Sequence, residues 1–262
     1  MKKHIILTAT NQRDGDFLIQ HWLPSLRTNV ALSNIDIVVF DYGLTRNQLL
    51  ALNKTKVPVI RGSLNGHIVS MRFVDAGTFL KTTHYDQVLF VDSGDIIFQD
   101  DISHLFETQK NTFRAAQLNM EVLFFEVFVH YFPRAMRSQL WNTLKDKPVL
   151  NAGFILAPRR KFIELCEAVN TMVPDKMKYG PDQVIVNYVL YKTGFVLLDK
   201  KYNFMGNIEK GGFTITEGVF YRKDGEKIVV MHNAGHNGML RPIRNFGFGK
   251  RYNRINYPAY YG

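Results

Sequence analysis

QVLFVDSGDIIF, residues 87–98, is the stretch that decides the fold. Its first five residues are almost wholly apolar, which is typical of a strand buried on both faces of a sheet. Asp92 and Asp95 follow directly, separated by Ser93 and Gly94. Glycine adopts backbone angles that other residues avoid. The stretch therefore predicts a buried strand that ends in a turn carrying two carboxylates.

Strand and helix patterns alternate before this stretch. Pro24 is expected to bend or divide the first helix, and Thr45 is expected to cap the second. The alternation predicts βαβ units and a mostly parallel sheet in an α/β domain. The expected strands are residues 4–10, 35–43, 57–62 and 87–92, and the expected helices are 17–28, 46–54 and 68–81.

Ligands of open α/β sheets bind at the carboxyl ends of the strands. Three segments fall at such ends in this chain: Thr8–Thr10, Asp41–Gly43 and Asp92–Asp95. We expect them to share one edge of the sheet.

The second half of the chain is less regular. Its patterns predict strands at 149–157, 195–199 and 227–232 and helices at 161–173 and 182–193. No linker, repeat or low-complexity block interrupts the chain. We expect one domain over residues 1–240, with a mixed, mostly parallel sheet flanked by helices, followed by a basic, aromatic tail over 241–262.

Composition limits the class of partner. The 262 residues carry a net charge of +10, which suggests nucleic acid, anionic lipid or a phosphorylated substrate without choosing among them. The single cysteine, Cys166, excludes an intramolecular disulfide and favours a reducing compartment. No stretch approaches the roughly 20 apolar residues that cross a bilayer. We expect a cytoplasmic protein, either soluble or peripheral on the membrane.

The two acids after the buried strand suggest a metal site. Like charges at close range repel, so Asp92 and Asp95 both stay ionised only beside a cation or strong donors. Mg²⁺ and Mn²⁺ take such carboxylate ligands together with substrate phosphates, and a divalent ion can neutralise a diphosphate leaving group. The alternative is an Asp/Gly turn with solvated acids, and the motif alone does not decide between the two.

Seven stretches occur in a characteristic order along the chain. They are HIILTAT (4–10), FDYGLTRNQLLAL (40–52), YDQVLFVDSGDIIFQDDISHLF (85–106), LNAGFILAPRR (150–160), GPDQVIVNYVLY (180–191), LLDKKYNFM (197–205) and VVMHNAGHNGMLRP (229–242). This order resembles that of the GT-A-fold (Rossmann-like) glycosyltransferases. The resemblance is closest to family 8, which includes glycogenin-like enzymes and bacterial lipopolysaccharide galactosyl- and glucosyltransferases, and it spans residues 4–242.

This resemblance implies a metal site. Asp92 and Asp95 match the two acids of the D-x-D motif, although two residues separate them here instead of one. His232 matches the late histidine that completes the coordination, with His236 as a second candidate. Imidazole favours Mn²⁺ over Mg²⁺, which remains an alternative.

The resemblance also implies donor-binding and catalytic residues. Thr8, Ala9 and Thr10 match the wall of the uridine pocket, mainly through backbone contacts, and Asp92 is expected to contact the ribose as well. A glycine in mid-strand, as at position 153, also suggests close approach of a ligand. The expected donor-binding residues are Thr8, Ala9, Thr10, Asp92, Asn151, Ala152, Gly153 and Arg241; the expected catalytic residues are Asp182, Gln183 and Arg72.

The predicted function is metal-dependent transfer of a hexose from a nucleotide sugar, a UDP-sugar above all, to a saccharide, glycolipid or glycoprotein, with retention. Three alternatives are a nucleotidyltransferase, a non-catalytic relative and a nucleic-acid-binding protein. Few glycines follow the first strand, which counts against a nucleotidyltransferase. The D-x-x-D, D-Q and His set argues against a non-catalytic relative, and no recognised binding module supports a nucleic-acid-binding protein. Aromatic residues in 113–147 are expected to shape the acceptor side, although core packing explains many of them equally well.

The tail combines arginines with aromatic residues. That composition suits peripheral contact with an anionic membrane. RNA binding by base stacking and simple packing of the tail on the domain are the alternatives.

Overall fold

A seven-stranded sheet forms the centre of the computed structural model, which describes residues 2–118, 123–206, 212–235, 241 and 243–251. Only β7 runs antiparallel to its neighbours, so the prediction of a mixed, mostly parallel sheet is confirmed. In spatial order the strands are β3 (Val59–Arg61), β2 (Ile35–Asp41), β1 (His4–Thr10), β4 (Gln87–Val91), β7 (Leu150–Pro158), β6 (Phe113–Gln117) and β8 (Phe195–Leu197).

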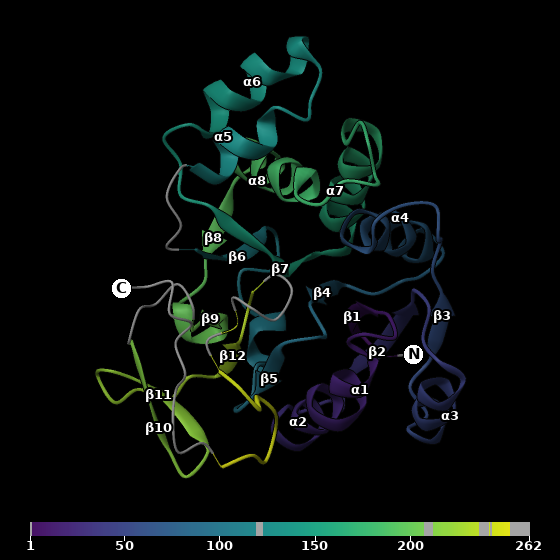
Figure 1. Cartoon of the computed structure of the whole chain (residues 1–262), viewed down its shortest axis with the longest axis vertical. Coiled ribbons are helices and arrows are strands. Elements are labelled where there is room, and N and C mark those ends of the chain that lie inside the picture. Colours follow the sequence, from purple (N-terminus) through teal and green to yellow (C-terminus); the bar gives the residue numbers. More distant parts are fainter. Residues whose placement is uncertain (1, 119–122, 207–211, 236–240, 242, 252–262) are drawn as a thin grey trace.

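Helices cover both faces of this sheet (Figure 1). On one face Ile5 and Leu7 pack with α4 (Ile68–Lys81), α5 (Leu123–Val129), α6 (Arg134–Leu144), α7 (Arg159–Met172) and α8 (Pro181–Thr193). On the other face Ile6 packs with the helical segment of residues 15–29 and with α3 (Arg46–Lys54). The side chains of a strand alternate between faces, and this explains why continuous apolar runs supply both cores.

Two local predictions are confirmed. Thr45 accepts a bond from the Gln48 N–H, and the Gln48 side chain bonds back to Thr45, which completes a capping box on α3. The segment 15–29 divides into α1 (Gly15–Phe17), a π-helical turn (Leu18–Trp22) and α2 (Leu23–Asn29). Pro24 sits in the first turn of α2, where its missing N–H is tolerated.

A small second sheet brings a late strand to the site. β12 (Val230–His232) lies between β5 (Ile96–Phe98) and β9 (Phe204–Met205), and His232 pairs with Ile96. A hairpin of β10 (Phe213–Thr216) and β11 (Val219–Arg222) lies nearby. Two 3₁₀ turns, Ser103–Phe106 and Lys200–Tyr202, complete the regular elements of the described residues.

The described part of the tail packs on the rest of the chain. Ile243 is buried and exchanges two hydrogen bonds with the Asn233 side chain. Phe246 stacks on Phe17. Residues 252–262 lie outside the described residues, so membrane contact through the tail stays a prediction. In the described part of the chain, no helix combines the length and apolar character that a bilayer crossing needs.

Candidate metal and donor site

A cavity of about 530 Å³ opens where the carboxyl ends of β1 and β4 meet. Ala9, Asp92–Asp95, the start of α8, His232 and Arg241 all line it. Thr10 pairs with Asp41 in the register of β1 and β2, so the three predicted segments share this edge. Asp41 itself closes the turn before α3, because its carboxylate accepts the N–H groups of Gly43 and Leu44.

Hydrogen bonds from three directions fix the turn that carries the acids. The Asp92 N–H donates to the Gly153 carbonyl at 2.9 Å, and the Trp22 indole N–H donates to the Asp92 carbonyl at 3.0 Å. The Ser93 hydroxyl donates to the Ala9 carbonyl at 2.8 Å. The backbone at Asp92 is therefore tied to β1, to β7 and to the π-helical turn.

Asp14 lies against Gly94, so a side chain at position 94 would displace it. A Cβ atom there would stand 2.6 Å from the Asp14 Cγ. Asp14 comes from the loop after β1 and lines the cavity. Its pKa is raised, since burial disfavours the charged form and outweighs the attraction of Arg241 and Arg13.

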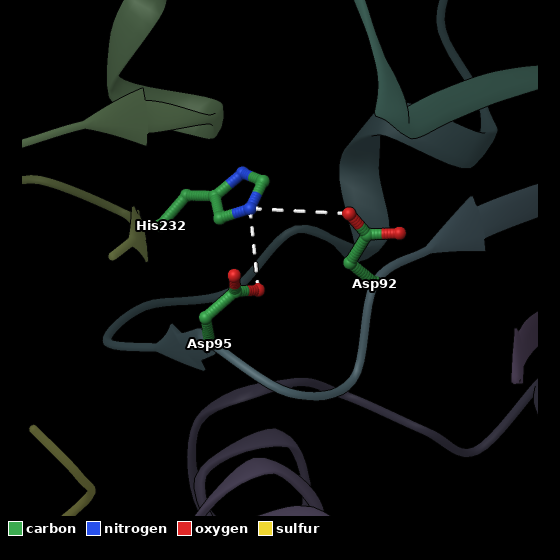
Figure 2. A group of neighbouring side chains, drawn as sticks. All are labelled: Asp92, Asp95 and His232. Atoms are coloured by element: carbon green, nitrogen blue, oxygen red, sulfur yellow. Dashed lines mark ion pairs between the residues drawn. The ribbon is translucent and has the colours of Figure 1, made fainter. Parts of the chain in front are cut away.

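His232 points at both acids of the turn, as Figure 2 shows. Its Nε2 lies 3.3 Å from the Asp95 Oδ1 and 4.0 Å from the Asp92 Oδ2. Its Nδ1 lies 2.9 Å from the Asn203 Oδ1. An amide oxygen only accepts, so Nδ1 carries the proton that it donates. In the neutral ring, the Nε2 lone pair then faces the two carboxylates.

This donor set fits a divalent cation. Asp92, Asp95 and His232 each offer one ligand atom, and these atoms lie within 4.8 Å of one another. Two carboxylate oxygens and one imidazole nitrogen suit Mn²⁺, with phosphate or water oxygens completing the shell. A lone pair aimed at two anions also has no favourable partner unless a cation or a proton lies between them.

Arg72 of α4 is fixed beside the same cluster. Its guanidinium donates to the Asp92 carboxylate and lies over the rings of Phe73 and Phe90 at 5.4 and 5.2 Å. Burial lowers the pKa of Arg72, but Asp92 and Asp182 outweigh it and the net shift is upward. Burial raises the pKa of Asp92, but Arg72 and His232 outweigh it and the net shift is downward. Asp92 is thus held as a carboxylate and Arg72 as a cation.

The first turn of α8 supplies Asp182 and Gln183 to the cavity wall. Burial raises the pKa of Asp182 to about 6, although Arg72 and two backbone N–H groups oppose the shift. The Gln183 amide accepts the Ala152 N–H at 3.1 Å and donates to the Leu150 carbonyl. Gln183 therefore holds α8 to β7 with both ends of its amide.

Strand alternation divides the predicted donor residues of β1 and β7 into two sets. Thr8, Thr10 and Ala152 do not line the cavity, whereas Ala9, Asn151 and Gly153 do. The Thr8 hydroxyl instead donates to the Val91 carbonyl inside the sheet, at 2.7 Å. Neighbouring side chains on a strand point to opposite faces. The contacts expected of Thr8–Thr10 are mainly through the backbone, and they stay a prediction.

The Asp92 carboxylate explains the glycine in β7. A Cβ atom at position 153 would stand 2.8 Å from the Asp92 Cγ and closer still to its Oδ2. The sequence suggested that a ligand approaches this glycine. The group that does approach it is a candidate metal ligand.

Arg241 reaches the turn from the far end of the chain. It donates to the Gly94 carbonyl at 3.1 Å and to the Asp95 Oδ2 at 3.2 Å. Its Nη2 also lies 3.9 Å from the Asp14 Oδ1. His236, the second candidate ligand, lies outside the described residues.

Asp14, Trp22 and Asn203 contact the turn or His232 and were missed from the sequence. Asn203 lies in the LLDKKYNFM stretch, so its place in an ordered motif was the available signal. Trp22 has an ordinary core position in a helix, and Asp14 lies in a loop. Neither carries a local pattern that marks a site.

Comparisons with known proteins give matches of family and of fold. A family model described as "Glycosyl transferase family 8" matches residues 61–237. The galactosyltransferase LgtC, solved with donor and acceptor sugar analogs, aligns at a TM-score of 0.58 and 17% identity over 92% of this chain and 90% of its own. An active-site mutant of LgtC aligns at a TM-score of 0.57 and 19% identity, over 88% of this chain and 87% of its own.

A longer protein shares the fold in part. The glycosyltransferase GlyE of Streptococcus pneumoniae TIGR4 aligns at a TM-score of 0.56 and 18% identity, over 94% of this chain and 57% of its own. A search of curated protein sequences gives no significant match. At these identities the structural likeness establishes the fold.

Proposed function

Because the chain belongs to glycosyl transferase family 8 and has the GT-A fold, we propose that it transfers a hexose from a UDP-sugar to a carbohydrate-bearing acceptor, with a divalent metal and with retention. The observation that carries the proposal is the cluster of Asp92, Asp95 and His232 on the wall of the cavity. Family membership supports glycosyl transfer itself. The metal, the uridine and the stereochemistry are our inferences.

The residues that would hold the metal are Asp92, Asp95 and His232. A bound Mn²⁺ would supply positive charge to the diphosphate of the donor. Arg72 and Arg241 stand on either side of the acids and are positioned to add to that charge. Both guanidinium groups bond carboxylates in this state, so a diphosphate would compete with Asp92 and Asp95 for them.

Asp182, Asn151 and Gly153 would lie beside the donor sugar. Asp182 is buried, and burial favours its protonated form. A group with a pKa of about 6 exists in both forms near neutral pH. It can therefore accept a hydrogen bond from a sugar hydroxyl or donate one.

A nucleotide-sugar hydrolysis screen with Mn²⁺ tests this function without knowledge of the acceptor. We expect release of UDP from one of the UDP-sugars, loss of release with chelator, and loss with Asp95→Asn. Asp86→Asn is the matched control, since Asp86 is an exposed acid at the other end of β4. Undiminished turnover with chelator or in Asp95→Asn would refute the metal assignment. Turnover of other nucleotide sugars alone would refute the uridine.

A further inference from the structure

Large apolar side chains gather beside the cavity. Among the residues that the structure describes, seven large hydrophobic side chains are exposed. Five of these seven belong to three segments of the chain. Such gathering on a surface usually marks a binding site. We name the five side chains the apolar rim: Leu64 before α4, Val127 and Tyr131 in and after α5, and Met177 and Tyr179 between α7 and α8.

The three segments touch one another. The His67 N–H donates to the Lys176 carbonyl at 2.7 Å, which joins the loop of Leu64 to the loop of Met177. The Phe128 ring lies 6.2 Å from that of Tyr179 and 6.1 Å from that of Tyr131, which joins α5 to the same loop. The rim is therefore carried by three segments that contact one another.

These segments continue into the cavity wall. Phe124, Phe128 and Tyr179 line the cavity, as do Asp92 and Asp182. A molecule with one end at the acids can thus extend along aromatic rings toward the exposed side chains of the rim.

We propose that the apolar rim binds the hydrocarbon part of an amphipathic acceptor whose sugar lies in the cavity. The inference rests on the proposed function and names its acceptor class. Aromatic rings alone would not distinguish a hydrocarbon chain from a sugar as the group that binds here, because they also stack on sugars. Leu64, Val127 and Met177 are aliphatic and offer nothing to sugar hydroxyls, whereas they bury methylene groups favourably.

The test is the binding of alkyl glycosides of increasing chain length to the full chain. Methyl, butyl, hexyl and octyl β-D-glucosides and β-D-galactosides are titrated below their micelle concentrations, and Kd is measured by calorimetry. We expect Kd to fall by about twofold per methylene, since a rim open to solvent buries roughly half of the added surface. The slope against chain length is independent of how well each sugar head fits.

Met177→Ser and Leu64→Ser should flatten that slope. Leu50→Ser and Leu197→Ser are the matched controls, because Leu50 and Leu197 are 52% and 53% exposed and lie outside the rim, against 65% for Met177 and 61% for Leu64. A flat slope in the unaltered chain, or equal flattening in the controls, overturns the proposal. The proposal is also overturned if the slope is absent and Met177→Ser instead abolishes a dimer of the chain or its binding to vesicles of anionic lipid.

The slope of Kd against chain length tests the acceptor class, and hydrolysis of the donor tests the proposed function, so the two proposals can be refuted separately. If no UDP-sugar is hydrolysed, the proposed function is wrong whatever the slope. If UDP release depends on metal but the slope is flat, only the acceptor class is wrong.

Discussion

Gly153→Ala is expected to weaken metal binding by displacing Asp92. The new methyl carbon would stand 2.8 Å from the Asp92 Cγ and 2.9 Å from the Asn151 Oδ1. Carbon atoms in contact normally lie about 3.5–4.0 Å apart, so the carboxylate must shift by roughly 0.7 Å or more. Metal–ligand distances tolerate only about 0.2 Å.

The expected loss of Mn²⁺ affinity is therefore tenfold or more, or about 1.4 kcal/mol of binding free energy. Overpacking alone should cost about 1–3 kcal/mol of stability. Titration calorimetry measures the first quantity, and urea unfolding of the metal-free protein measures the second.

Gly77→Ala is the control for overpacking. A Cβ at position 77 would stand 2.7 Å from the Cys166 Cβ, between α4 and α7 and outside the cavity wall. Its Mn²⁺ affinity should match that of the unaltered chain. Unchanged Mn²⁺ binding in Gly153→Ala, or an equal loss in Gly77→Ala, would refute the placement of Asp92 as a ligand held over Gly153.

Three further variants test the surroundings of the site. Trp22→Phe removes the N–H bonded to the Asp92 carbonyl; urea unfolding should show a loss of about 1 kcal/mol, and calorimetry should show weaker Mn²⁺ binding. Asn203→Leu frees the His232 ring and should weaken Mn²⁺ binding by about 10–100-fold, whereas Asn203→Asp should restore it; equal affinity in both variants would contradict an orienting role. Burial raises the pKa of Asp182 to about 6 in the folded chain, so its ionisation as pH rises from about 4 to 7 lowers the stability of the fold. Urea unfolding of the metal-free chain should therefore show that Asp182→Asn is more stable than the unaltered chain at about pH 7 and equally stable at about pH 4. The same difference in unfolding free energy at both pH values would count against the shifted pKa.

The first half of the fold could be predicted because its patterns are local. The apolar run of β4 and the helical spacing of α4 each lie within one element, and both were placed to within a residue. Residues 113–147 gave no such signal, because Phe, Met and Leu recur there without a period. They form β6, α5 and α6.

The candidate metal ligands could be named from the sequence because two of them follow a strand and the third belongs to an ordered motif. The residues that hold these candidate ligands in place could not be predicted. The indole of Trp22 bonds a carbonyl 70 positions away, and Asn203 bonds a histidine 29 positions away. Such pairs form only after the sheet has assembled, so no local window of sequence contains them. At Thr8, Thr10 and Ala152 the alternation of a strand was available to show that these side chains do not line the cavity, whereas the expected backbone contacts stay a prediction.

The spacing of the acids was the weakest point of the sequence argument, and the turn shows how two intervening residues still give one site. Ser93 is buried, and its hydroxyl bonds back to Ala9 at the end of β1. Gly94 lies against Asp14, which a side chain at position 94 would displace. After these two residues and Asp95, β5 begins at Ile96, the residue paired with His232. Because Ile96 pairs with His232 and the Asn233 N–H donates to the Asp95 carbonyl, the pairing of β5 with β12 holds Asp95 near the imidazole independently of the spacing of the two acids.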